Sequence, residues 1–389
     1  MNTRPPLVSI GQLAQELADR AEDVCRRLLP AGRREGKDWV DARRAKGGLG
    51  DSLKVCLNGP KAGVFCHWGV AGRPAGDMID LVAYLVTAGD KGQAARWARA
   101  FLGYDDKVDP RTLETRRRQA AAKRKASQRS AEAEAKKVAG RAQKLFIEAQ
   151  ADLIGTPAAS YLMGRGIDLR RLDRPVRSLR FHGALKTVDG ERTITAPGLV
   201  AAIAAADGSF AGVHRTFLMP RADGSWVKRP LGRDGADSKK SYGRYAGGCI
   251  RLWNGEHADP ATGEVRAGPR WRELDRAIEP HAQKHGGIPV DHPLRRCLIS
   301  EGIEDGLTAV LARPELRVLV AVSLSNMGAM ALPPGIAEVI LLRQNDDKAQ
   351  ALAAFDRAID HFQRLGVNVR LAPPPAGVKD INDMVRKGA

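Results

Sequence analysis

Short apolar runs alternate with helical patterns in the last quarter of the chain. The runs cover 297–300, 316–323, 339–342 and 367–371, and the stretches between them carry apolar residues at helical spacing. This alternation is typical of βαβ units, in which helices cover both faces of a parallel sheet. We therefore predict an α/β domain over 294–389, with the residues 324–328 as a turn.

The preceding region has the pattern of a smaller mixed domain. Apolar runs at 199–206 and 210–218 flank Asp207-Gly208, a typical hairpin turn. Further strand-like pieces at 225–228, 239–243 and 247–252 follow, and helical patterns at 145–149 and 158–163 come first. These features predict an α+β subdomain over 145–293.

The front of the chain predicts a small α+β domain over 1–104. Residues 9–29 read as one amphipathic helix that starts with a Ser9/Gln12 capping box. Its apolar face consists of Ile10, Leu13, Leu17, Ala21, Val24 and Leu28. Strands are expected at 39–40, 53–57 and 64–68, followed by a helix capped by Asp77 and a second helix at 91–102.

Residues 105–144 form a basic segment between these domains. Ten Lys and Arg residues lie between 111 and 137 against three Glu residues, and almost no apolar face is present. Such a segment is either an exposed helix or a partly disordered linker. It either binds a nucleic-acid backbone by charge or is simply solvated.

Composition narrows the class of protein. With 389 residues, 43% hydrophobic and 28% charged, the chain is an ordinary soluble protein of two or three domains. It has no run of about 18 apolar residues for a membrane helix, no signal-peptide pattern, and five scattered cysteines that do not suggest disulfides. We expect a cytoplasmic protein.

The net charge of +18 favours a polyanionic partner, nucleic acid rather than membrane. The alternative is that an Arg-favouring, GC-rich genome produced this charge.

Two carboxylates follow strand-like runs in the C-terminal region. Glu301 follows the run at 297–300, and Asp346 follows the run at 339–342. Because ligands bind at the carboxyl ends of strands in open α/β sheets, these side chains could meet in one crevice. Two hard oxygen ligands at such a place suit Mg2+.

This stretch resembles a Toprim domain, the metal-binding fold of DNA primases, topoisomerases and some nucleases. Glu301 matches the first motif and Asp346 the second Asp of an Asp-x-Asp motif, whereas Gln344 replaces the first. The resemblance implies phosphoryl transfer with Mg2+ or Mn2+, in which Glu301 acts as general base or orients the attacking hydroxyl. It gives Glu301, Asp346, Asp347 and Gln344 as candidate metal ligands.

Other acidic residues have more than one interpretation. Asp380 and Asp383 match a family tail motif, although Asp347 and Asp380 also suit helix or turn capping. Because Gln344 brings no charge, two hypotheses stay open. Either Asp347, Glu304 or nucleotide phosphates complete a working site, or the domain binds nucleic acid without catalysis.

Residues 153–384 also resemble phage- and plasmid-borne primase-like Toprim proteins, through the order of short motifs such as Gly212-Val-His-Arg-Thr216 and Gly247-Gly-Cys-Ile-Arg-Leu252. The resemblance implies a basic subdomain that holds template and nucleotide. Its candidate phosphate contacts are His214, Arg215, Lys228, Lys239, Lys240 and Arg251, each of which could instead be a solvated surface residue. Since neighbours on a strand point to opposite faces, we expect only one of His214 and Arg215 to face the crevice.

The front domain resembles the zinc-binding domain of DNA primases. Cys56, Cys66 and His67 would supply three ligands at most, and no Cys-x-x-Cys pair is present. We therefore expect a degenerate domain without zinc, in which Cys56 and Cys66 are small buried residues. Its basic loop residues contact a template strand or are solvated: Arg33, Arg34, Lys37, Arg43, Arg44 and Lys46.

Together these resemblances imply a DNA primase, a nucleotidyltransferase that makes short primers on single-stranded DNA from nucleoside triphosphates in phage or plasmid replication. A replicative helicase is a candidate partner, and no membrane partner is expected. The alternatives are a non-catalytic nucleic-acid-binding replication factor and a Toprim nuclease.

Overall fold

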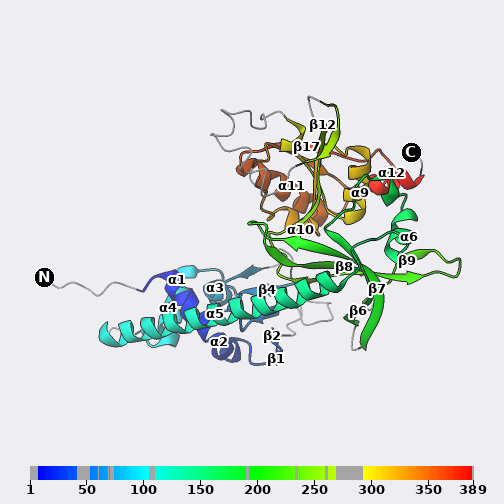
Figure 1. The fold of residues 1–389 in the computed structure, drawn as a ribbon. Coiled ribbons are helices and arrows are strands. Elements are labelled where there is room, and N and C mark those ends of the chain that lie inside the picture. The colour runs from blue at the N-terminus through cyan, green and yellow to red at the C-terminus, as the bar shows by residue number, and fades with distance from the viewer. Residues whose placement is uncertain are drawn as a thin grey trace. The chain divides into compact units, whose positions relative to one another are not determined.

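The computed structural model describes residues 8–41, 53–59, 61–68, 70, 74–104, 110–189, 192–232, 235, 237–258, 262–268, 292–333 and 335–387. The chain divides into two compact units, Met1–Glu134 and Ala135–Ala389. The division falls inside α5 (Pro110–Glu148), a continuous helix of 39 residues (Figure 1). The sequence left an exposed helix and a partly disordered linker as alternatives for the basic segment, and the structure shows a helix. No helix among the described residues is long and apolar enough to cross a membrane.

The first unit packs helices against one antiparallel sheet. The sheet has the order β1 (Arg33–Glu35), β2 (Asp38–Asp41), β3 (Leu53–Cys56), β4 (Phe65–His67) and β5 (Ala75–Gly76). The helices are α1 (Ile10–Asp19), α2 (Ala21–Leu28), α3 (Met78–Val86) and α4 (Lys91–Leu102). The three predicted strands and the two predicted helices that follow them are present, whereas β1 and β5 were not predicted. Arg43, Arg44 and Lys46 lie outside the described residues.

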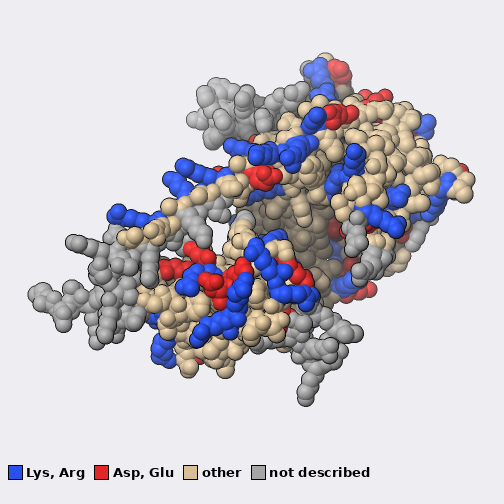
Figure 2. All heavy atoms as spheres, turned by 90° about the horizontal axis from the view of Figure 1, so that it is seen from below, with Lys and Arg blue, Asp and Glu red and all other residues tan. Residues whose placement is uncertain are grey.

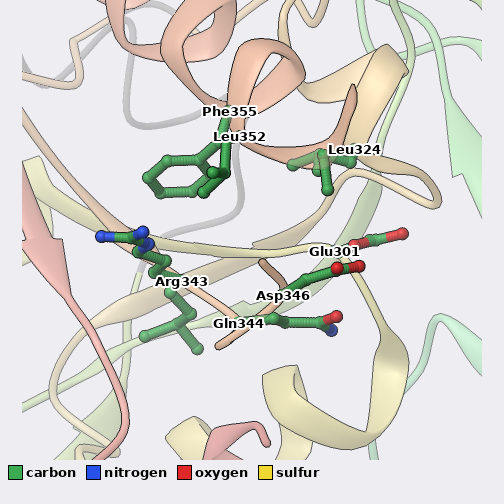
Figure 3. A pocket seen from close by; sticks show the side chains of 9 residues that line it. Glu301, Leu324, Arg343, Gln344, Asp346, Leu352 and Phe355 are labelled. Atoms are coloured by element: carbon green, nitrogen blue, oxygen red, sulfur yellow. The ribbon is translucent and has the colours of Figure 1, made fainter. Parts of the chain in front are cut away.

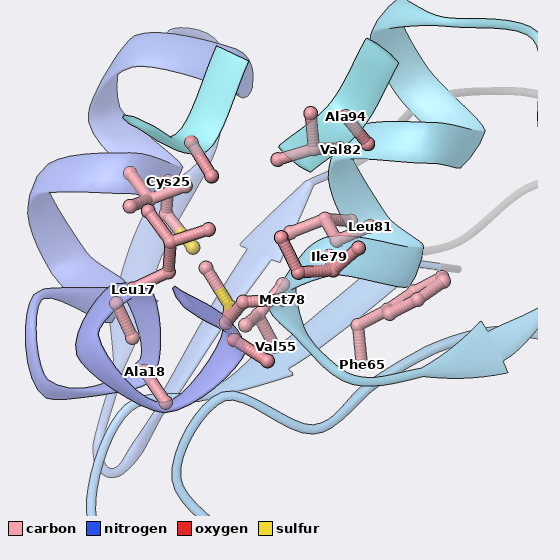
Figure 4. Close-up of a cluster of buried hydrophobic side chains, with 14 of the residues drawn as sticks. Leu17, Ala18, Cys25, Val55, Phe65, Met78, Ile79, Leu81, Val82 and Ala94 are labelled. Atoms are coloured by element: carbon pink, nitrogen blue, oxygen red, sulfur yellow. The ribbon is translucent and has the colours of Figure 1, made fainter. Parts of the chain in front are cut away.

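The core of this unit joins α1 and α3 to the sheet. Leu17, Met78, Val55 and Phe65 are buried there (Figure 4). Both predicted caps are present: Ser9 and Gln12 form a capping box, and Asp77 accepts hydrogen bonds from the first turn of α3.

The prediction of a single helix over 9–29 is wrong. The helix breaks at Arg20, whose backbone leaves the helical region with φ −119° and ψ 28°. The break redirects α2, so that Ala21, Val24 and Cys25 also face the core. Ile10, assigned to the apolar face, is 47% exposed at the helix start.

The second unit contains an antiparallel sheet in its first half. Its path is β10 (Lys239–Gly243), β8 (Phe210–Pro220), β7 (Arg192–Ala204) and β6 (Leu179–Asp189), and β9 (Trp226–Lys228) pairs with β8. The β7–β8 hairpin turns at Asp207-Gly208 as predicted, and Gly208 has a φ of +77° that favours glycine. The strand β6 was not predicted. Short helical elements α6 (Pro157–Met163) and η1 (Leu169–Arg171) precede the sheet.

The C-terminal sheet has the order β11 (Ile250–Asn254), β15 (Arg317–Val320), β14 (Arg296–Ser300), β16 (Glu338–Leu342) and β17 (Asn368–Ala372). The last four strands are parallel, whereas β11 is antiparallel to β15. This edge strand comes from the region assigned to 145–293. The helices are α9 (Ile303–Ala312), α10 (Leu324–Met327), α11 (Ala349–Arg364) and α12 (Ile381–Lys387), and α10 replaces the turn predicted at 324–328. The small elements β12 (Glu256–Ala258), β13 (Val265–Ala267) and η2 (Pro293–Arg295) complete the described fold.

Alternating residues of the parallel strands divide between two cores. Leu298 and Val318 belong to the cluster that contains Leu307 of α9, while Ile299 belongs to the cluster that contains Phe362 of α11. Because successive strand residues point to opposite faces, helices must cover both sides of the sheet. Figure 1 shows α9 and α11 on the two sides. The α/β fold class, preceded by α+β regions, is confirmed.

Leu17→Ala should lower the free energy of unfolding of the first unit by about 2–5 kcal/mol, because it opens a cavity in the core. Ile10→Ala, in the same helix but half exposed, should change it by less than about 1 kcal/mol. Urea unfolding of the intact chain, followed by tryptophan fluorescence, measures both. Equal losses would contradict the division of α1 into buried and exposed positions.

Candidate metal and nucleotide site

Glu301, Gln344 and Asp346 lie together at the carboxyl edge of the parallel sheet. Glu301 directly follows β14, and the other two follow the adjacent parallel strand β16. With Leu324 and Phe355 among their neighbours, they line a recess of about 30 Å³ (Figure 3). The recess is large enough for an ion or water but too small for a nucleotide.

The surroundings of Glu301 raise the pKa of its carboxyl above the usual value. Burial raises the pKa of the Glu301 carboxyl, and the nearby charge of Asp346 adds to that effect. Asp346 Oδ1 accepts a hydrogen bond from the backbone N–H of Lys348 at 3.0 Å. Asp346 thus makes the turn contact that was considered for Asp347. Asp347 is exposed and does not line the recess.

Gln344 is held from the opposite side by Asp305. Its Nε2 donates to Asp305 Oδ2 at 3.3 Å, and the backbone N–H of Asn382 donates to Asp305 Oδ1 at 3.0 Å. Burial raises the pKa of Asp305 to about 6, and the charge of Asp380 contributes. Asp305 was not singled out from the sequence, although it belongs to the same short run as Glu301.

The donor set of the recess fits Mg2+ or Mn2+. It offers two carboxylates and one amide oxygen, which are hard ligands. Within the described part of the chain, no three His, Cys, Asp or Glu residues form a group that could hold a metal ion. A cation here would therefore use the Gln344 oxygen together with water or substrate phosphate, as Mg2+ commonly does.

A larger cavity of about 640 Å³ shares Glu301 and Gln344 with the recess. Lys228 and Lys239, both predicted as phosphate contacts, line it. Three further cations that line it were not predicted: Arg165, Lys379 and Arg386. Lys379 directly precedes the acidic tail motif, which could have indicated it, whereas nothing in the sequence brings Arg165 to this place. Asp380 and Asp383 also line the cavity, and Asp380 Oδ1 accepts from the Asp383 N–H at 2.7 Å.

A buried carboxylate, Glu304, organises the lysines of this cavity. It contacts Lys228 Nζ at 2.8 Å and Lys239 Nζ at 3.3 Å, and it accepts a hydrogen bond from the Tyr161 hydroxyl at 2.6 Å. Burial alone would raise the pKa of Glu304, but Lys239 and Lys228 bring it well below its usual value. Glu304 is thus ionised and engaged with the lysines, and it lines the larger cavity but not the recess that contains Asp346.

Strand alternation separates the predicted basic residues. His214 pairs across the sheet with Ser241, and Arg215 pairs with Lys240. His214 therefore lies on the same face as Lys239 and Arg215 on the opposite face, and neither His214 nor Arg215 lines the cavity.

Four of the six predicted phosphate contacts do not line the cavity: His214, Arg215, Lys240 and Arg251. Arg215 is buried, donates to the Lys186 carbonyl at 3.0 Å and lies over the Tyr242 ring. Lys240 donates to the Val188 carbonyl. Arg251 donates to the Ala206 carbonyl, beside the β7–β8 turn. Each guanidinium or ammonium is thus directed to backbone carbonyls of its own domain.

The candidate zinc residues are spread over two strands of the first unit. Cys56 Sγ contacts the Asn58 carbonyl at 3.2 Å, and His67 Nδ1 hydrogen-bonds the Tyr84 hydroxyl at 2.9 Å. Cys66 and His67 are consecutive on β4 and so point to opposite faces. Cys56 and Cys66 are half-buried, which corrects the expectation that both are buried.

The charged side chains on one face of the molecule are visible in Figure 2. On the face shown in Figure 2, Lys and Arg side chains are spread over the described surface with Asp and Glu among them. On α5, exposed cations include Lys125, Arg129, Lys136 and Lys137.

Comparison with protein families decides the nature of the C-terminal domain. A family model described as "Toprim domain" matches residues 296–389. The chain therefore carries a Toprim domain. A second model, described as "Domain of unknown function (DUF7146)", matches residues 136–252. No curated protein matches the chain.

Three solved structures with some similarity to this Toprim protein come from DNA primases. The Aquifex aeolicus primase (zinc-binding and RNA polymerase domains) is 15% identical, with a TM-score of 0.38, covering 98% of this chain and 83% of that one. A DNA primase domain from Pseudomonas aeruginosa is 12% identical, with a TM-score of 0.36 and coverage of 64% and 74%. The E. coli primase catalytic core is 16% identical, with a TM-score of 0.33 and coverage of 64% and 75%.

Glu304→Gln should lower the free energy of unfolding of the second unit by about 3 kcal/mol, because two partly buried ammonium groups lose their counter-charge. Glu315→Gln is the matched control: it breaks an exposed pair with Arg313 and should cost less than about 1 kcal/mol. Chemical denaturation at neutral pH compares them. Equal effects would show that the Glu304 network does not stabilise the domain.

His214 should make the second unit less stable in acid. Burial lowers the pKa of His214 to about 4, with the charge of Lys239 contributing. The unfolded chain takes up this proton near pH 6.5 but the folded chain does not, so stability falls as the pH drops from about 6.5 to 4, by up to about 3 kcal/mol. His214→Gln should reduce this fall when unfolding is measured at pH 7 and 4.5. The same pH dependence in both proteins would exclude His214 as a source.

Proposed function

We propose that this Toprim protein is a DNA primase, a nucleotidyltransferase that makes short primers on single-stranded DNA from nucleoside triphosphates. The observation that carries the proposal is the cavity in which Glu301, Gln344 and the adjoining Asp346 recess face Lys228 and Lys239. Its volume of about 640 Å³ lies in the range of small-molecule sites.

The cations of the cavity are suited to a triphosphate. Glu304 raises the pKa of Lys239 against the opposing effect of burial, so this lysine stays charged. Lysine contributes a compact positive charge, whereas Arg165 and Arg386 can each bind two phosphate oxygens at once. Together they offset the charge of a nucleotide that approaches the acidic edge of the sheet.

Glu301 is proposed as the general base. The primer 3′-hydroxyl would attack the α-phosphorus, forming a new O–P bond and breaking the bond to the pyrophosphate leaving group, while its proton passes to Glu301. A carboxylate whose pKa is raised by burial is a better acceptor near neutral pH. Asp346 and Gln344, beside Glu301, would hold Mg2+ or Mn2+, which supplies neutralisation of phosphate charge.

Template binding is proposed to depend on charge. The exposed cations of α5 and the net charge of +18 favour the sugar–phosphate backbone without base specificity. A phage or plasmid setting and a helicase partner belong to the same proposal.

A second candidate, a non-catalytic replication factor, is favoured by one specific observation. Gln344 stands where the family has a carboxylate, and the recess therefore carries one negative charge fewer. If this loss abolishes catalysis, the same cavity and cations would still bind nucleotide or DNA.

The test is primer synthesis on single-stranded DNA with labelled nucleotides and Mg2+ or Mn2+. The native protein should give metal-dependent oligonucleotides, and Glu301→Gln should reduce their rate by about a hundredfold or more through loss of the base. Asp356→Asn, which removes an exposed carboxylate from α11, should act like the native protein.

Other products would replace the proposal. Cleaved template would indicate a Toprim nuclease, and DNA binding without any product would indicate the non-catalytic factor.

A further inference from the structure

Gln344 stands where the Asp-x-Asp motif has its first carboxylate, and its side chain is fixed by a defined partner. Asp305 is buried in α9, and its Oδ1 accepts the backbone N–H of Asn382. Asn382 is itself fully buried, and its Nδ2 donates to the Arg165 carbonyl and to Thr308 Oγ1. Asp305 is therefore anchored between α9 and α12, and its Oδ2 is directed to Gln344.

This contact determines which end of the amide faces the recess. A carboxylate only accepts hydrogen bonds, so the NH2 group of Gln344 must point to Asp305. The amide oxygen then points the other way. In Figure 3 it lies on the side of Asp346 and Glu301, whose carboxylates end close by.

We propose that Asp305 is a positioning residue that turns the Gln344 oxygen into the recess, so that a neutral amide serves as a metal ligand there. Asp305 also keeps one negative charge directly behind the amide, in place of the carboxylate that position 344 lacks. This inference rests on the proposed metal-dependent function of the cavity.

A double-mutant cycle tests the proposal, with Mn2+ binding to the full chain measured from the electron paramagnetic resonance signal of free Mn2+. In Asp305→Asn, the oxygen of residue 305 stays on the Asn382 N–H, and its NH2 group then faces Gln344. The Gln344 amide must rotate, which presents its NH2 to the recess. Affinity should fall by about ten- to hundredfold.

The rescue variant combines Asp305→Asn with Gln344→Glu. The total charge and the side-chain lengths match the native protein, and the hydrogen bond is restored with its direction reversed. One oxygen of residue 344 again faces the recess, so affinity should return to within about threefold of native, a clear non-additivity. Gln344→Glu alone is the fourth protein of the double-mutant cycle, beside the native protein, Asp305→Asn and the double variant.

Three controls fix the interpretation. Glu301→Gln should weaken Mn2+ binding, Asp356→Asn should not, and thermal unfolding in EDTA should show that all variants are folded. An equal fold-loss from Asp305→Asn in the native protein and in the Gln344→Glu variant would overturn the positioning role. Native affinity in Asp305→Asn, or no effect of Glu301→Gln, would overturn it as well. Because no DNA or nucleotide is present, a failure of this binding test can be told apart from a failure of primer synthesis.

Discussion

One buried carboxylate, Glu304, connects the Toprim domain to the domain before it. It lies in the first turn of α9 and contacts Lys228 of β9, Lys239 of β10 and the hydroxyl of Tyr161 in α6. Breaking one contact of such a buried network leaves an uncompensated charge, which costs free energy. The network therefore holds its members at fixed separations. The contact places two cations opposite the carboxyl edge of the parallel sheet. The cavity between these lysines and Glu301 therefore depends on the contacts of Glu304.

The carboxylates at the edge of the parallel sheet, Glu301 and Asp346, could be predicted from the sequence because the order of strands and helices determines where they lie. Short apolar runs separated by helical patterns indicate parallel strands, and residues that follow neighbouring strands meet at one edge. Glu301 and Asp346 follow β14 and β16, which are neighbours in the sheet. The Toprim assignment based on them is confirmed. The helix caps at Ser9 and Asp77 depend only on residues nearby in the sequence, so they could be predicted as well.

The lysines that line the cavity, Lys228 and Lys239, were harder to predict, because consecutive residues on a strand point to opposite faces of the sheet. Lys239 and Lys240 look equivalent in sequence, but register places only Lys239 with His214. Contacts between distant segments, such as Tyr161 with Glu304 or Asn382 with Asp305, leave no periodic signal. The break at Arg20 and the edge strand β11 likewise depend on tertiary packing. Gln344 was recognised as a departure, but its partner Asp305 required the structure.

We propose that the metal binds where Glu301, Gln344 and Asp346 meet. Oxidative cleavage by Fe2+ substituted for Mg2+, with ascorbate and mass-spectrometric mapping of the cut backbone, locates the bound ion. We expect cuts near Glu301 and between Gln344 and Asp346, suppressed by excess Mg2+ and absent in Glu301→Gln. Cuts confined to other segments, such as those around Cys66 and His67, or cuts at these positions that Mg2+ does not suppress, would contradict it.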